Sequence, residues 1–140
     1  MTQQEKTDYA ALALRTSLGA MFIAHACLKV FTFTMAGSVG FFESVGLPGS
    51  LAYLVTCVEL IGGAALILGL FVRVVAAALI PILIGTILFV HGSKGWMFAY
   101  EGGGWEYPAF LIVVSFAVIL LGKGAYAVPL GQTSMKSVDS

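Results

Sequence analysis

The chain has 140 residues, of which 59% are hydrophobic and only 10% are charged. Soluble domains are about 45–50% apolar and about 25% charged, so a soluble protein of this length could not cover its core with so few charges. Seven basic residues balance seven acidic ones, which leaves no net charge to attract nucleic acid. The mean hydropathy of +0.99 also excludes a disordered chain. The composition predicts a protein that contacts the lipid bilayer.

Four apolar stretches are suited to crossing a hydrocarbon core of about 30 Å as helices. The expected helices cover about residues 10–33, 51–71, 74–91 and 106–121. Membrane β-strands need alternating segments of about ten residues, whereas these runs are continuous. We therefore predict an all-α membrane protein, a four-transmembrane-helix bundle that forms one integral membrane domain over residues 1–140.

Two short segments predict how the helices are connected. Gly69–Arg73 interrupts the long apolar run formed by the second and third helices and indicates a tight helical hairpin. Phe41–Phe42, followed by Glu43, indicates a short interfacial segment between the first and second helices. The first helix follows a polar amino end that is a poor match to a signal peptide, so we expect this helix to be retained.

Basic residues near the helix ends predict the orientation. Four spans place both termini on one side of the membrane, and Lys and Arg are enriched on the cytoplasmic side. The predicted terminal side has Lys6, Arg15, Arg73, Lys123 and Lys136, whereas the other side has Lys29 and Lys94. We therefore expect a multi-pass protein of a bacterial or archaeal inner (plasma) membrane, with both termini cytoplasmic.

Ionisable side chains gather in the outer half of the predicted bundle. At about 1.5 Å per residue, His25 matches the depth of Glu59 more closely than Lys29 does, by about 6 Å. An unpaired acid inside a bilayer costs roughly 2.5–3.5 kcal/mol, so Glu59 is expected to face the bundle interior with a partner. We predict a polar pocket in which Glu59 pairs with His25, and these two residues are the candidate catalytic groups.

Five further polar residues are candidate substrate contacts: Lys29, Arg15, His91, Glu106 and Tyr107. Structural interpretations stand beside the functional ones. Arg15 also fits a snorkelling anchor, and His91 also fits a helix cap. A purely structural ion pair, or a protonated acid, is the alternative interpretation of Glu59.

The Gly-rich connection over residues 92–108 is unusually aromatic. It contains Trp96, Phe98, Tyr100, Trp105 and Tyr107. One interpretation is an aromatic belt at the membrane interface. The other is a mobile lid over the outer pocket, with Gly102–Gly104 as its hinge.

The sequence contains no zinc motif, P-loop, dinucleotide fingerprint or hydrolase elbow. Cys27 and Cys57 form no Cys-x-x-Cys motif, and helical phase points both away from the predicted pocket. We therefore identify no metal site and no intrinsic cofactor.

Several motifs occur in a distinctive order. They are R-x3-G-x-x-F-x-x-H-x3-K from Arg15 to Lys29, FFESVGLP, V-E-L-I-G-G-x-A-L-I-L-G-L-x-x-R from Val58 to Arg73, His91, Glu106-Tyr107-Pro108, and G-K-G-A-Y from Gly122 to Tyr126. With these motifs the sequence resembles the DoxX family of small integral membrane proteins over about Ala13–Val128. The resemblance implies a four-helix bundle and an association with quinone-linked or thiol-oxidative redox systems.

The leading hypothesis is a membrane subunit of a redox system that binds a quinone or a similar lipid-soluble molecule in the outer pocket. Since the chain has no recognisable electron cofactor, a partner subunit would supply the electrons. One alternative is a non-enzymatic scaffold or assembly partner of a redox or thiol-stress complex, and a homo-oligomer is left open. Another is a b-type cytochrome with His25 and His91 as axial ligands.

Overall fold

The computed structural model describes residues 1–130, and within this range the chain forms helices and no strands. This confirms the prediction of an all-α protein. Lys136, which contributes to the predicted charge bias, and the last ten residues of the predicted domain lie outside the described residues. The elements are α1 (Gln3–Cys27), the π-helix η1 (Leu28–Thr32), α2 (Met35–Ser44), α3 (Leu51–Leu68), α4 (Val72–Thr86), the π-helix η2 (Ile87–His91), the 3₁₀-helix η3 (Gly92–Lys94) and α5 (Glu106–Leu121).

Three helical segments are long and apolar enough to cross a membrane: Gln3–Thr32, Leu51–Leu68 and Val72–Lys94. Large apolar side chains such as Ile61 and Leu120 point outward, as lipid contact requires. The fourth predicted span, α5, is apolar but has 16 residues, about 24 Å at about 1.5 Å per residue. That α5 crosses the membrane therefore stays a prediction.

The first helix begins earlier than hydropathy predicts. The Thr2 hydroxyl accepts a hydrogen bond from the Glu5 backbone N–H at 3.1 Å, and the Glu5 carboxylate accepts one from the Thr2 N–H at 2.6 Å. This reciprocal capping box starts a helix among polar residues. Hydropathy marks where a chain can enter hydrocarbon, whereas the cap determines where its helix begins.

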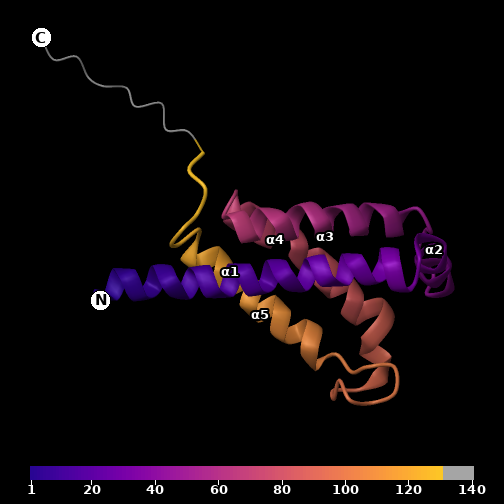
Figure 1. Ribbon diagram of the computed structural model, residues 1–140. Coiled ribbons are helices and arrows are strands. Elements are labelled where there is room, and N and C mark those ends of the chain that lie inside the picture. Colours follow the sequence, from indigo (N-terminus) through magenta and orange to yellow (C-terminus); the bar gives the residue numbers. More distant parts are fainter. Residues whose placement is uncertain (131–140) are drawn as a thin grey trace, which may run out of the picture.

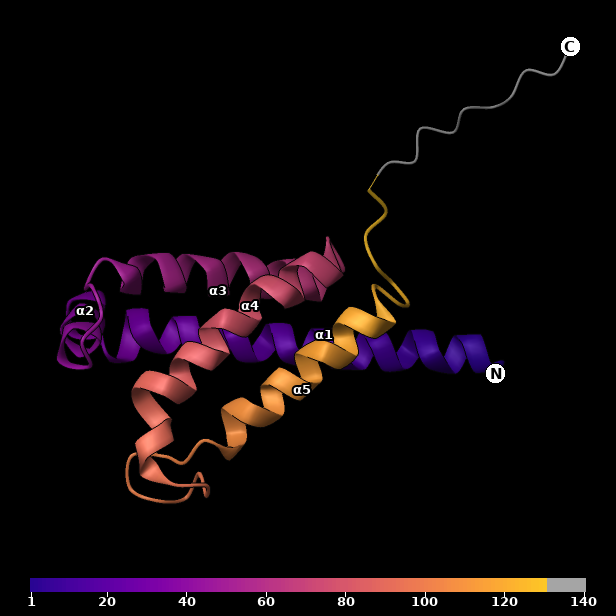
Figure 2. The ribbon, with the colours of Figure 1, turned by 180° about the vertical axis from the view of Figure 1, so that it is seen from behind.

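The long helices form two antiparallel pairs. α1 packs chiefly against α3, and α4 packs chiefly against α5. Figure 1 shows α1 and α3 lying side by side, with α2 at one end, and Figure 2 shows α4 and α5 crossing them obliquely. The short helix α2 occupies the place of the predicted interfacial segment. The apolar core lies where the four long helices meet, and its buried members are Leu18, Phe22, Leu66, Val72, Ala76, Leu79, Leu83, Leu111 and Val118.

Two glycines allow the backbones of α1 and α3 to approach closely. A Cβ atom on Gly19 would lie 2.5 Å from the Gly63 carbonyl oxygen, and a Cβ on Gly63 would lie 2.7 Å from that of Gly19. Small residues at helix contacts permit this kind of packing in membranes. The Gly19–Gly63 contact therefore sets how closely α1 and α3 pack.

The predicted hairpin between α3 and α4 is also confirmed. Gly69 ends α3 in the left-handed conformation with φ of 78°, and α4 begins three residues later at Val72. The turn lies at the same end of the molecule as the amino terminus and the end of α5 (Figure 1). Backbone hydrogen bonds connect the segment after α5 to the other two helices at this end. The Ala125 N–H donates to the Asp8 carbonyl of α1, and the Val128 N–H donates to the Leu68 carbonyl of α3.

Arg15 is fully buried at this end of the molecule. Its Nε atom donates to the Lys123 carbonyl at 2.7 Å, and Nη2 donates to that of Ala125 at 2.8 Å. Its Nη1 atom donates to the last carbonyls of α3, those of Leu66 at 2.8 Å and Ile67 at 2.6 Å. The snorkelling interpretation of Arg15 is wrong, because the guanidinium does not extend to the surface and instead binds free carbonyls of two chain segments.

Replacing Arg15 by Lys should destabilise the protein strongly. An ammonium group lacks the planar fork of donors that reaches four carbonyls at once, so buried acceptors lose their partners at a cost of at least about 3 kcal/mol. The same change at the exposed Arg73 is the matched control. Thermal unfolding in detergent should show a much lower Tm for Arg15→Lys than for Arg73→Lys, and equal values would contradict the role given to Arg15.

Replacing Gly19 by Ala should separate α1 from α3. Its new methyl group would press on the Gly63 carbonyl, and overpacking of this kind costs about 1–3 kcal/mol. Gly85 is the matched control, because a Cβ there meets nothing within 4 Å and Ala suits a helix better than Gly. We expect Gly19→Ala to lower the Tm and Gly85→Ala to preserve or raise it. The reverse order would exclude the close approach.

Candidate functional site

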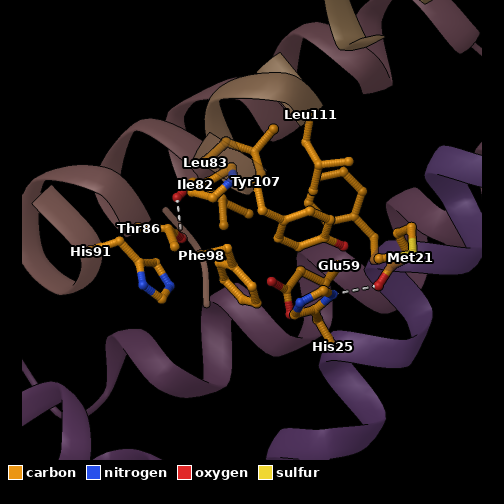
Figure 3. Close-up of a pocket in the computed structure, with 12 residues that line it drawn as sticks. Met21, His25, Glu59, Ile82, Leu83, Thr86, His91, Phe98, Tyr107 and Leu111 are labelled. Atoms are coloured by element: carbon orange, nitrogen blue, oxygen red, sulfur yellow. Dashed lines mark hydrogen bonds between the residues drawn. The ribbon is translucent and has the colours of Figure 1, made fainter. Parts of the chain in front are cut away.

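A cavity of about 90 Å³ lies between the helices, toward the end of the molecule that carries the aromatic loop (residues 95–105). Figure 3 shows the side chains of His25, Glu59 and Tyr107 gathered around it. Every long helix contributes to its wall. The lining residues are Met21, Phe22, His25, Glu59, Ile82, Leu83, Thr86, His91, Phe98, Tyr107, Pro108 and Leu111.

Glu59 and Lys29 form an ion pair beside this cavity. Lys29 Nζ lies 2.6 Å from Glu59 Oε2, and the two side chains are 17% and 5% exposed. Glu59 comes from α3 and faces the bundle interior, as predicted, whereas Lys29 comes from the π-helix η1. The pair joins α3 to the carboxyl-terminal end of the first predicted span.

The predicted preference of Glu59 for His25 over Lys29 is wrong. The prediction compared depths of backbone positions along the helix. Side chains of a helix lean toward its amino end, so the long Lys29 side chain extends back toward the level of Glu59. The Lys29 ammonium group therefore reaches Glu59 although the two backbone positions differ in depth by about one helical turn.

His25 lies next to this pair with its own hydrogen bond fixed. Figure 3 shows its imidazole beside the Glu59 carboxyl group. His25 Nδ1 is 2.7 Å from the Met21 carbonyl oxygen. Because a carbonyl can only accept, Nδ1 carries the hydrogen, which leaves Nε2 of the neutral ring as an acceptor. The ring can therefore receive a proton at Nε2.

Tyr107 supplies a hydrogen-bond donor without a partner. Its ring stacks against that of His25 with centroids 6.1 Å apart and planes inclined by 24°. The Tyr107 hydroxyl is buried and has no hydrogen-bond partner among the residues that the structure describes. Figure 3 shows it directed toward the side of the cavity where Glu59 lies. An unsatisfied buried hydroxyl costs about 1–3 kcal/mol, which a ligand with an acceptor atom would recover.

His91 lines the cavity from the opposite side and also holds the aromatic loop. Its Nδ1 donates to the Gly103 carbonyl oxygen at 2.7 Å, so its Nε2 is likewise the acceptor of the neutral ring. The π-helix η2 brings Thr86 and His91 to the same cavity. In an α-helix, residues five apart point about 140° apart, whereas the wider π-turn aligns them more closely.

The aromatic loop covers the cavity through Phe98. The Phe98 ring lies 5.2 Å from that of Tyr107 and 5.8 Å from that of His91, measured between centroids. Its backbone N–H donates to Glu106 Oε1 at 3.1 Å. The loop therefore occupies the position of the predicted lid, and its movement about Gly102–Gly104 stays a prediction.

The other predicted site residues divide clearly. The cavity unites His25, Glu59, His91 and Tyr107, and Lys29 joins them through its ion pair. Glu106 does not line the cavity but holds the loop that covers it. Arg15 lies at the other end of α1, among backbone carbonyls, and is not part of this site.

Sequence reasoning missed Met21 and Thr86, which also line the cavity. No polar side chain stands three or four residues from Thr86 in the sequence, and its hydroxyl donates to the Ile82 carbonyl at 2.9 Å. The sequence pattern therefore does not indicate that Thr86 faces a polar cavity. Met21 contributes a backbone carbonyl, which no side-chain pattern reveals.

The geometry does not fit a haem ligated by two histidines, since Figure 3 shows the Phe98 ring between His25 and His91. Within residues 1–130, no three His, Cys, Asp or Glu side chains gather in a way that could hold a metal ion. Cys27 and Cys57 are free thiols.

Comparison with known proteins gives two matches. The DoxX family model matches residues 10–92, a range that contains His25, Lys29, Glu59 and His91. A protein of Bacillus subtilis (strain 168), named "Putative oxidoreductase CatD", is 33% identical over 116 residues, which cover 83% of this chain and 81% of that protein. No solved structure matches the chain.

A double-mutant cycle should show strong coupling between Lys29 and Glu59. Lys29→Met leaves a buried carboxylate without its partner, which costs about 3–5 kcal/mol, and adding Glu59→Gln should recover much of this loss. Lys94→Met, at an exposed lysine near the same end, is the control and should have little effect. Thermal unfolding in detergent measures the cycle, and strictly additive changes in Tm would contradict the pairing.

Proposed function

Since the chain belongs to the DoxX family, a family of small integral membrane proteins, we propose that it is a quinone-binding subunit of a redox system in a bacterial or archaeal inner membrane. The name of the Bacillus subtilis relative supports oxidoreductase chemistry. The observation that carries the proposal is the unpartnered Tyr107 hydroxyl, buried beside an ion pair in a membrane-spanning protein. A lipid-soluble molecule with a hydrogen-bond acceptor is the ligand that such a site suits.

The size of the cavity defines which part of the ligand it receives. About 90 Å³ is smaller than the cavity of about 150 Å³ that holds benzene. The cavity therefore accommodates the carbonyl end of a quinone rather than its whole ring. The Tyr107 hydroxyl donates to the carbonyl oxygen, and the neighbouring apolar wall of Leu83 and Leu111 excludes water from it.

Interconversion of quinone and quinol moves two electrons and two protons. His25 exchanges one of the two protons with the ring oxygen in the cavity through Nε2, while the adjacent Glu59 carboxylate stabilises the imidazolium form of His25. The other ring oxygen lies outside the cavity and exchanges the second proton with water. Lys29 balances the charge of Glu59, so the site does not bury a lone anion. Electrons come from a partner subunit, because the sequence contains no recognisable electron-carrying motif.

The proposed orientation places both termini in the cytoplasm. Lys6, Arg73 and Lys123 lie toward the end of the bundle that carries the amino terminus, whereas Lys29 and Lys94 lie toward the loop end, in agreement with the positive-inside tendency. The cavity then lies in the outer half of the membrane, so protons are exchanged with the outer side.

Binding of a soluble quinone tests the proposal directly. Tyr107→Phe removes only the hydroxyl and should weaken the binding of decylubiquinone about tenfold, the effect of losing one well-placed hydrogen bond. The control is Tyr53→Phe, which alters an exposed tyrosine on α3 and should bind as the unaltered protein does. Equilibrium dialysis of the protein in lipid nanodiscs measures both Kd values.

A second measurement separates the proposal from a scaffold role. Gentle purification from native membranes, followed by solvent extraction and mass spectrometry, should recover quinone with the unaltered protein and much less with Glu59→Gln. It should also recover the partner subunit. The scaffold alternative is established instead if neither Tyr107→Phe nor Glu59→Gln changes quinone binding and Glu59→Gln lowers only the Tm.

A further inference from the structure

A second hollow adjoins the cavity on the outer surface of the bundle. It is an open groove of about 740 Å³ between the aromatic loop and α5. Trp96 and Trp105 of the loop region form one wall, with ring centroids 4.5 Å apart and planes inclined by 82°. Phe110 and Val113 of α5 form the other wall and are 65% and 63% exposed, so the groove opens on an apolar face of the fourth predicted span.

The groove and the cavity share two side chains. Phe98 and Tyr107 line both hollows, and their rings are 5.2 Å apart. The groove and the cavity therefore meet at this pair of rings. Phe98 is 44% exposed, so its ring has space to turn without disturbing the core.

We propose that this groove binds the ring and hydrocarbon tail of a flat, lipid-soluble carbonyl compound, and that the ligand reaches the cavity sideways from the bilayer past Phe98. The inference rests on the proposed function and adds where the rest of the ligand lies. Three observations favour this occupant: the cavity admits only one end of a ring, the groove walls are aromatic, and Tyr107, whose hydroxyl has no partner among the described residues, lines both groove and cavity.

The two tryptophans of the chain provide the test. The sequence contains two Trp residues, and both line the groove. A quinone in contact with an indole ring quenches its fluorescence, so the intrinsic fluorescence of the whole protein reports occupancy of this groove. In lipid nanodiscs, decylubiquinone should quench the emission along a saturable curve, whereas decylbenzene, which lacks carbonyl groups, should compete with it only at about tenfold higher concentration.

A matched pair of variants on α5 separates the groove from general partition into lipid. Phe110→Ala removes part of the groove wall and should weaken the saturable quenching at least about fivefold, the effect of one aromatic contact. Phe116 is also exposed on α5 but does not line the groove, so Phe116→Ala should leave the curve unchanged.

The outcomes distinguish the inference from the proposed function. If decylubiquinone binds by equilibrium dialysis and depends on Tyr107, yet quenching is absent or equal in Phe110→Ala and Phe116→Ala, the groove is not its site and only this inference fails. If decylubiquinone does not bind at all, the proposed function and the inference fail together. Saturable quenching that is weakened only by Phe110→Ala supports both.

Discussion

The buried guanidinium group of Arg15 connects three parts of the chain that are distant in sequence. Arg15 of α1 holds the end of α3 and the segment that follows α5, through hydrogen bonds to backbone carbonyls. Helix ends in a bilayer need such partners, because no water is present to satisfy them. By closing one end of the bundle, this contact fixes the positions from which the helices diverge toward the cavity at the other end.

The cavity also contains buried polar groups that need hydrogen-bond partners, but there one group is left without a partner within residues 1–130. At the closed end each guanidinium nitrogen of Arg15 donates to a carbonyl, whereas at the other end the Tyr107 hydroxyl has no partner among the described residues. The Glu59–Lys29 pair neutralises its own charge, so the site is polar without carrying a lone buried ion. One end of the molecule is thus built for stability, and the other has an unused donor for a ligand.

The sequence was most informative where a single side-chain property decides the structure. Apolar length predicted α5 with its observed bounds, and Gly69 predicted the hairpin. It was least informative where backbone atoms or helix geometry decide. The partners of Arg15 are carbonyls, which have no signature in a sequence, and the reach of Lys29 depends on the lean of its side chain. Glu59 was identified because a charged group in an apolar helix is conspicuous, and Tyr107 because it belongs to the aromatic connection and to the Glu106-Tyr107-Pro108 motif.

The two π-helices place an additional residue in the last turn of α1 and of α4. Each is closed by a hydrogen bond that spans five residues, from Phe33 N–H to the Leu28 carbonyl and from Gly92 N–H to the Ile87 carbonyl. The direction of every side chain beyond such a turn depends on that one inserted residue. Loss of a single residue from η2 would rotate His91 by about 100° and detach it from Gly103. The shape of this site is therefore sensitive to chain length at two points where an apolar sequence would otherwise tolerate insertion and deletion.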